Sequence, residues 1–423
     1  MAESLPPPRL RSPDRTGVLD ATPLDGLLDD DHQARVVWDF CRQLDVTPLT
    51  DPLRARQGRP GRAALDPRLA IALWLYATLE GVGSARQLAI LCTHHNAFRW
   101  LCGGVTVNYH TLADVRVKHA TFLDGLLTHS VAVLREQGLV DLNRVAHDGT
   151  RVRASAGAAS FRRKPTLEEC LLEAEDQVAR LKEEMDDDPA ASSRQQAAAR
   201  ERAARERVTR VGAALKRLPE LEAKKKPDER DRTRCSTTDA EATVMKMADG
   251  GYRPAYNMHF AADTKSLVIV GVDVLTTGSD QGQLMPMVGQ IHERHGRYPA
   301  EYLADGGFGQ HADIEAVTAK GVTVYAPVPQ PKDANRDRHR ARPGDGPVIA
   351  EWRERMGTEA AKELYKDRAA TAECVNAQAR NRGLVRLLVR GVEKVQAVAR
   401  WFAVAHNVAC GTRLRAARVA MAT

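Results

Sequence analysis

The sequence predicts an α/β protein in which helices cover a mixed β-sheet, with an all-helical region before the sheet and a helical hairpin inserted into it. Three observations support this class. Residues 31–138 carry helix signals throughout, three strand-like segments then precede an alternation of helix and strand, and a heptad repeat separates the first strand from the second. Hydrophobic residues make up 43% and charged residues 28%, which excludes a fully disordered or fibrous chain.

The first 138 residues divide into a tail and a helical domain. Residues 1–30 are rich in proline and in small or acidic residues, and this composition predicts a disordered tail because it buries little surface. Residues 31–138 are predicted to be all-helical. Asp66 before Pro67 is a helix start signal, for example, and Gly81 ends the apolar run that follows.

Strand signals begin at residue 142. β-branched and aromatic residues concentrate in five short segments that we expect to form one sheet: 142–147, 256–262, 267–274, 301–304 and 322–328. A turn at Asp263 should join the second and third segments into a hairpin, and Asp280 is expected to cap a helix that runs to about His295. Prolines and glycines predict a loop over 329–350, and two helices should close the chain over 358–382 and 384–420.

A large insertion, residues 166–226, separates the first strand from the second. Its apolar residues repeat with heptad spacing on both sides of a break at Pro189. Residues 168–188 hold ten acids against two bases, whereas residues 194–226 hold eleven bases against four acids. Opposite charges attract, so we expect an intramolecular antiparallel hairpin within the core. A coiled-coil assembly factor would explain this segment, but not the acids described below.

Charge points to a polyanionic partner. The chain has 62 lysines and arginines against 55 acids, for a net charge of +7. Nine of the bases lie between residue 376 and the end, where Glu393 is the one acid. We expect a DNA-binding surface there, with a solvated charged surface as the alternative. Seven cysteines without CxxC spacing predict reduced thiols, no zinc site and a cytoplasmic protein, and neither a membrane span nor a signal peptide is expected.

Two aspartates are placed for chemistry. Asp148 and Asp305 each follow a predicted strand and precede glycine, and the carboxyl ends of strands are where open sheets bind ligands and metals. The alternative for each one is a simple turn residue. In the helix predicted over 358–382, Glu373 and Arg380 are seven residues apart and share a face with Asn376. An ordinary surface pair is the alternative there.

Together these elements resemble a known family. The two aspartates, with the pattern Tyr365-x2-Arg368-x4-Glu373-x6-Arg380, are similar to the catalytic core of the DDE transposases of bacterial insertion sequences, in the branch marked by a Tyr-Arg-Glu-Lys signature. Other similar segments are 98–104, 108–112, 251–257 and 278–283, so that the resemblance spans about residues 31–410. Two features depart from that branch: four residues instead of three separate the arginine from the glutamate, and arginine replaces the final lysine.

The resemblance implies a ribonuclease H-like catalytic domain over 139–410, with a DNA-binding helical domain over 31–138 and a basic tail over 411–423. Asp148, Asp305 and Glu373 would be the catalytic residues and the ligands of two Mg²⁺ ions, with Mn²⁺ as a substitute. Tyr365, Arg368 and Arg380 would contact phosphates. The charge pattern adds further expected DNA contacts at Arg86, Arg116, Lys118, Arg382, Arg386 and Arg390.

The implied function is transposition of an insertion sequence. The protein would bind double-stranded DNA at the terminal inverted repeats of the transposable element, cleave it with Mg²⁺, and join it to target DNA as part of DNA recombination. A homodimer in the active complex, associated with the nucleoid in the cytoplasm, is expected. The alternative is a catalytically inactive, transposase-derived DNA-binding protein, which intact acids at all three positions disfavour.

Overall fold

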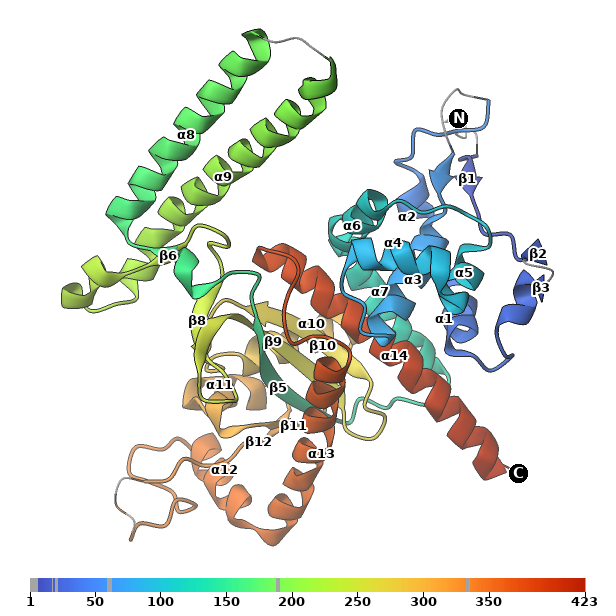
Figure 1. Cartoon of the computed structure of the whole chain (residues 1–423). Helices are drawn as coiled ribbons and strands as arrows, with labels where there is room; N and C mark the ends of the chain where they lie inside the picture. Colours follow the sequence, from blue (N-terminus) through green and yellow to red (C-terminus); the bar gives the residue numbers. More distant parts are fainter. Residues whose placement is uncertain are drawn as a thin grey trace, which may run out of the picture.

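The computed structural model describes residues 7–16, 18–19, 22–58, 63–187, 191–331, 333 and 335–422. A central sheet carries helices on both faces, a helical region lies beside it, and a long two-helix arm projects away (Figure 1). This arrangement confirms the predicted fold class, an α/β core of the ribonuclease H-like kind with additional helical parts.

The sheet has the order β10-β9-β5-β11-β12, with β8 (Thr243–Lys246) pairing to β9. Strand β9 (Tyr252–Asp263) runs antiparallel to both of its neighbours, β5 (Arg144–Arg153) and β10 (Ile269–Leu275), and the expected hairpin joins β9 to β10. Strands β11 (Glu301–Ala304) and β12 (Thr323–Tyr325) run parallel to β5. All five predicted strands are therefore present in one mixed sheet.

The first strand is longer than predicted. β9 pairs with β5 from Val145 as far as Arg153, so Asp148 lies within the strand and does not end it. Its other neighbour, β11, pairs with β5 only through His147. Asp148 therefore marks the point where parallel pairing stops while antiparallel pairing continues, which the sequence of β5 alone does not reveal.

Helices cover the two faces of the sheet unequally. One face packs α10 (Leu284–His295), α11 (His311–Thr318) and α12 (Pro347–Gly357) around buried aromatic residues that include Tyr302 and Trp352. The other face packs α13 (Glu359–Asn381) and α14 (Val392–Ala422). The expected closing helices are thus present, although the second begins at Val392 because residues 383–391 form a connecting segment.

The N-terminal region is helical, as predicted. Asp66 caps α3 by accepting a hydrogen bond from the Arg68 backbone, and the buried Trp74 indole donates to the Leu112 carbonyl at 2.9 Å. The helices are α1 (Gln33–Arg42), α2 (Thr47–Thr50), α3 (Pro67–Leu79), α4 (Ala85–His94), α5 (Asn96–Cys102), α6 (Tyr109–Lys118) and α7 (Ala120–Glu136). Helix α14 packs against α3, α6, α7 and β10, so these helices share one hydrophobic core with the sheet.

The N-terminal end differs from the predicted tail where the structure describes it, whereas the C-terminal end forms the helix expected to about residue 420. β1 (Leu10–Arg11) pairs with β4 (Ala64–Leu65), and the Arg15 guanidinium lies 3.7 Å from the ring centre of Trp38. The short elements β2 (Val18–Leu19), β3 (Thr22–Pro23) and η1 (Leu24–Leu27) follow. At the other end α14 continues as a helix to Ala422. Composition missed the N-terminal contacts because the surfaces that order this end belong to distant residues.

The insertion forms the predicted antiparallel hairpin. Helix α8 (Lys164–Asp187) packs along α9 (Ala191–Ala223), and Leu167, Val211 and Leu218 are buried between them (Figure 1). Arg207 of the basic helix bonds to Glu173 of the acidic helix at 3.0 Å. The arm leaves and rejoins the core through η2 (Ala158–Ser160), β6 (Phe161–Arg162), η3 (Pro227–Arg232) and β7 (Cys235–Ser236).

Candidate active site

Sheet register brings the two predicted aspartates together. Ala304, the last residue of β11, pairs with His147 of β5, so Asp148 in β5 and Asp305, directly after β11, each follow this last parallel pair. Adjacent strands lie about 4.8 Å apart, and both carboxylates lie within 4 Å of one guanidinium group, that of Arg368. The structure thus brings together two carboxylates that are 157 positions apart in the sequence.

Helix α13 supplies the residues that face this pair. The Arg368 guanidinium lies 3.1 Å from Asp148 Oδ1 and 3.9 Å from Asp305 Oδ2. Asn376, two helical turns further on, donates a hydrogen bond to Asp148 Oδ2 at 3.0 Å. The Tyr365 hydroxyl donates to the Ala304 carbonyl at 3.0 Å and so fixes the helix against the end of β11.

The electrostatic balance of the site explains the position of Arg368. Burial raises the pKa of Asp148 above its ordinary value, and the negative charges of Asp305 and Asp280 raise it further. The Arg368 guanidinium opposes these effects. Two adjacent carboxylates repel each other, so the centre is stable when a positive charge lies between them. Arg368 supplies that charge here.

Glu373 makes no described hydrogen bond or ion pair with this centre. Its side chain is exposed on α13, and among the described residues it has no hydrogen bond or ion pair. Within the same described ranges, no group of three histidine, cysteine, aspartate or glutamate side chains is arranged to hold a metal ion. The described arrangement most similar to a metal site is the pair of carboxylates of Asp148 and Asp305. Its hard oxygen donors, which already accommodate the cationic Arg368, fit a divalent cation such as Mg²⁺.

A third carboxylate beside the centre was not expected. Asp280 is not the cap of α10, which begins at Leu284 and whose first backbone N–H groups donate hydrogen bonds to the buried Asp313 carboxylate. Asp280 Oδ1 instead accepts a hydrogen bond from Asn257 at 2.6 Å and lies 3.2 Å from His259 Nε2. Burial alone would raise the pKa of Asp280, but these two partners outweigh burial and lower the pKa below its ordinary value.

Two glycines make room for Asp280. A Cβ atom on Gly149 would lie 2.8 Å from Asn257 Oδ1, 2.9 Å from Asp280 Oδ1 and 2.9 Å from His259 Nε2. A Cβ atom on Gly307 would lie 2.9 Å from Asp305 Oδ1 and 3.4 Å from Asp280 Oδ2. The glycines that follow each predicted aspartate are therefore the sequence signal that something packs closely there, although they do not identify Asp280.

His147 belongs to the same buried network. Its Nε2 lies 2.9 Å from His259 Nδ1, and both rings are buried against Phe308. Burial, together with the nearby His259 and Arg368, holds the pKa of His147 well below its ordinary value, so this imidazole is neutral at pH 7. A hydrogen-bonded connection thus runs from His147 through His259 to Asp280.

The other predicted DNA contacts fall into two groups. Arg116 of α6 and Arg382 and Arg386 of the segment after α13 line one cavity. The remaining residues are separate: Arg380 and Arg390 are exposed, the Arg86 guanidinium lies 5.2 Å from the Tyr109 ring centre, and Lys118 forms an ion pair with Asp114 at 2.8 Å. Where these residues lie does not test the prediction that they contact DNA.

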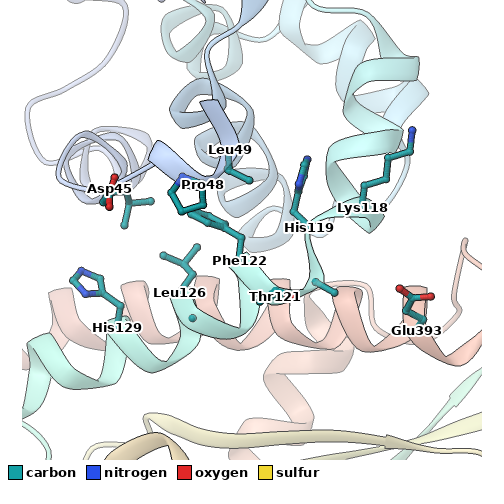
Figure 2. Close-up of a pocket in the computed structure, with 13 residues that line it drawn as sticks. Asp45, Pro48, Leu49, Lys118, His119, Thr121, Phe122, Leu126, His129 and Glu393 are labelled. Atoms are coloured by element: carbon teal, nitrogen blue, oxygen red, sulfur yellow. The ribbon is translucent and has the colours of Figure 1, made fainter. Parts of the chain in front are cut away.

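A larger hollow lies far from the carboxylates. It has a volume of about 620 Å³ between α2, α7 and the start of α14, and Figure 2 shows Leu49, Phe122 and Leu126 on its apolar walls. His119, His129 and Glu393 stand at its edges without converging on one point (Figure 2). This hollow has no carboxylate pair and contributes nothing to the centre around Asp148.

Comparisons with known proteins give two domain matches. Residues 228–408 match the transposase DDE domain, and residues 23–118 match a second transposase domain. No curated protein and no solved structure matches the chain. The first match covers Asp305 and α13, and the second covers most of the N-terminal helices. These two matches identify a DDE transposase domain and a second transposase domain in the chain, and the DDE transposase family acts on DNA and normally uses divalent metal ions. No described helix is both long and apolar enough to cross a membrane.

Proposed function

We propose that the protein is an active transposase that binds the terminal inverted repeats of an insertion sequence and performs strand cleavage and strand transfer. The observation that carries this proposal is the placement of Asp148, in β5, beside Asp305, directly after the parallel strand β11, with one cationic side chain near both. An inactive DNA-binding descendant would have no need to keep a repelling carboxylate pair.

The catalytic acids would be Asp148, Asp305 and Glu373, with two Mg²⁺ ions as cofactor and Mn²⁺ as a substitute. Bound Mg²⁺ supplies activation of an attacking oxygen and neutralisation of a leaving oxygen in phosphodiester chemistry. The two aspartates would hold the cation from the sheet. Glu373 is placed on the same helix as Arg368, so a small rotation or bend of α13 would bring its carboxylate toward the pair when a cation is present.

Residues on α13 would position the DNA. Arg368 would exchange its contact with Asp148 for a phosphate when metal enters, since the cation then satisfies the aspartates. Tyr365 would keep α13 seated on β11 through its bond to Ala304. This division of roles agrees with the Tyr-Arg-Glu-Lys branch, in which Arg380 would take the place of the final lysine.

The test is cleavage of a DNA duplex that ends in the inverted repeat flanking the gene. Replacing Asp148, Asp305 or Glu373 singly with alanine should abolish Mg²⁺-dependent nicking yet leave binding of the duplex within a few-fold of wild type, because metal ligands act on the transition state more than on docking. Glu363→Ala, on an exposed part of the same helix, is the control. Cleavage near the wild-type rate in Glu373→Ala would remove that residue from the proposal, and a wild-type protein that binds but never cleaves would favour the inactive alternative.

A further inference from the structure

A small cavity connects the N-terminal helices to the catalytic helix. It has a volume of about 190 Å³ and lies between the turn that joins α3 to α4 and the segment that follows α13, with Trp401 of α14 on a third side. The two backbones touch, since a Cβ on Gly383 would lie 3.0 Å from the Gly81 carbonyl oxygen. Gly383 has φ +84°, which favours glycine, so the contact is built into the backbone.

The cavity is lined by three arginines, Arg116, Arg382 and Arg386, and by no acidic residue. We call it the arginine cavity. Arg116 donates to the Gly83 carbonyl and lies 4.8 Å from the Trp74 ring centre, but neither group carries a negative charge. Among the described residues none of the three arginines forms an ion pair, and the buried Arg382 Nη1 has no hydrogen-bond partner.

Such an arrangement is costly without an anion. Burial lowers the pKa of Arg116 to about 10, and burial is also the main cause that lowers the pKa of Arg382. Both guanidinium groups remain charged at pH 7. No carboxylate lines the cavity to offset the free-energy cost of removing these charges from water. A buried donor without a partner requires an explanation, and a bound anion is the explanation that satisfies charge and hydrogen bonding together.

We propose that the arginine cavity binds one phosphate group of the DNA backbone. The proposal rests on the proposed function, because that function brings DNA to this face. Guanidinium groups bind phosphate through paired hydrogen bonds, and the cavity is large enough for one phosphate group. Its walls also include Ser84, the cap of α4, so the positive end of that helix adds to the field of the arginines.

Binding there would couple recognition to catalysis. Arg116 belongs to the N-terminal helices, whereas Arg382 directly follows α13, the helix that carries Arg368 and Asn376 against Asp148. One phosphate held between them would fix the register of a DNA end relative to the carboxylate pair. Contacts to phosphate position a protein on DNA but do not recognise the base sequence. The role of the arginine cavity is therefore to position the DNA end.

The test uses single phosphate replacements in the DNA. Duplexes that end in the flanking inverted repeat are made with one neutral methylphosphonate at successive positions, and their affinities are measured without Mg²⁺. Wild type should lose about tenfold in affinity at one position, as expected for one charge-assisted contact. Arg382→Gln should lose about as much on the unmodified duplex and then show no further loss at that position, because the two changes remove the same contact.

Salt dependence gives a second measurement. The slope of log affinity against log salt should fall by about 0.9 in Arg382→Gln and in Arg386→Gln, as for one phosphate contact. Arg297→Gln removes an exposed charge in the turn before β11, at the far end of that strand from Asp305, and should keep the wild-type slope. Arg386 is exposed, so its replacement should leave folding intact if Arg382→Gln proves unstable.

The outcomes are distinct. A wild-type slope and an unchanged methylphosphonate profile in both variants would overturn the proposal even if the protein cleaves DNA normally. Stabilisation of DNA-free protein by inorganic phosphate that Arg382→Gln abolishes, together with an unchanged DNA profile, would also overturn it, since the cavity would then hold a free anion. Failure of the proposed function would appear instead as wild-type protein that does not bind the duplex.

Discussion

Replacing Gly149 with alanine should damage the centre although the new side chain is one methyl group. The added Cβ would lie within 2.9 Å of polar atoms of Asn257, Asp280 and His259. Asn257 and His259 are each 1% exposed and hydrogen-bonded to Asp280, so none of these atoms has free space in which to move. Inserting a methyl group into such packing costs about 1–3 kcal/mol.

The assay is urea unfolding followed by circular dichroism, combined with the cleavage assay. We expect a loss of about 1–3 kcal/mol in the free energy of unfolding. Cleavage should fall by roughly 10²-fold, because Gly149 follows Asp148, a proposed catalytic acid, and a displacement of about 1 Å in such a group has that effect. The control is Gly157→Ala, since Gly157 has φ −95° and nothing within 4 Å of its Cβ position.

That control should stay within about 0.5 kcal/mol of wild type, as for other surface positions without special contacts. Equal unfolding midpoints and equal cleavage rates for Gly149→Ala and wild type would refute the reasoning. The close approach of Asp280 would then make no difference to the free energy of unfolding, and the presence of glycine after Asp148 would need another explanation.

Two further predictions concern the arm and a buried histidine. Replacing residues 167–218 with a short Gly-Ser linker should leave the sheet folded, because the arm joins the core through surface segments. If the arm contacts a second protomer or its DNA, the replacement should abolish pairing of two DNA ends. Normal pairing and transposition would show that the arm is passive. His406 is fully buried, and burial lowers its pKa from 6.5 to about 4. Its neutral form therefore favours folding above pH 6.5, and up to about 3 kcal/mol of stability should be lost as the pH falls from 6.5 to 4. The stability of His406→Asn should depend less on pH over that range, and an identical pH profile for both proteins would contradict this assignment.

Local chemistry in the sequence was enough to predict most of the secondary structure. The helix start at Asp66, the hairpin between β9 and β10 and the antiparallel arm each depend on residues close together in the chain, where capping, turn formation and heptad spacing act. The family resemblance likewise came from short motifs around Asp148, Asp305 and α13. These features are local, so one sequence specifies them.

Tertiary structure alone decided the composition of the centre. Whether Asp148 ends a strand depends on the lengths of β9 and β11, and the contact between Asp148 and Arg368 joins residues 220 positions apart. Asp280 looked like a helix cap because aspartate before a helix usually is one, but the hydrogen bonds from Asn257 and His259 exist only once β9 lies beside β5. Long-range packing sets these contacts. No local pattern in the sequence specifies which distant side chains will contact the carboxylates of the centre.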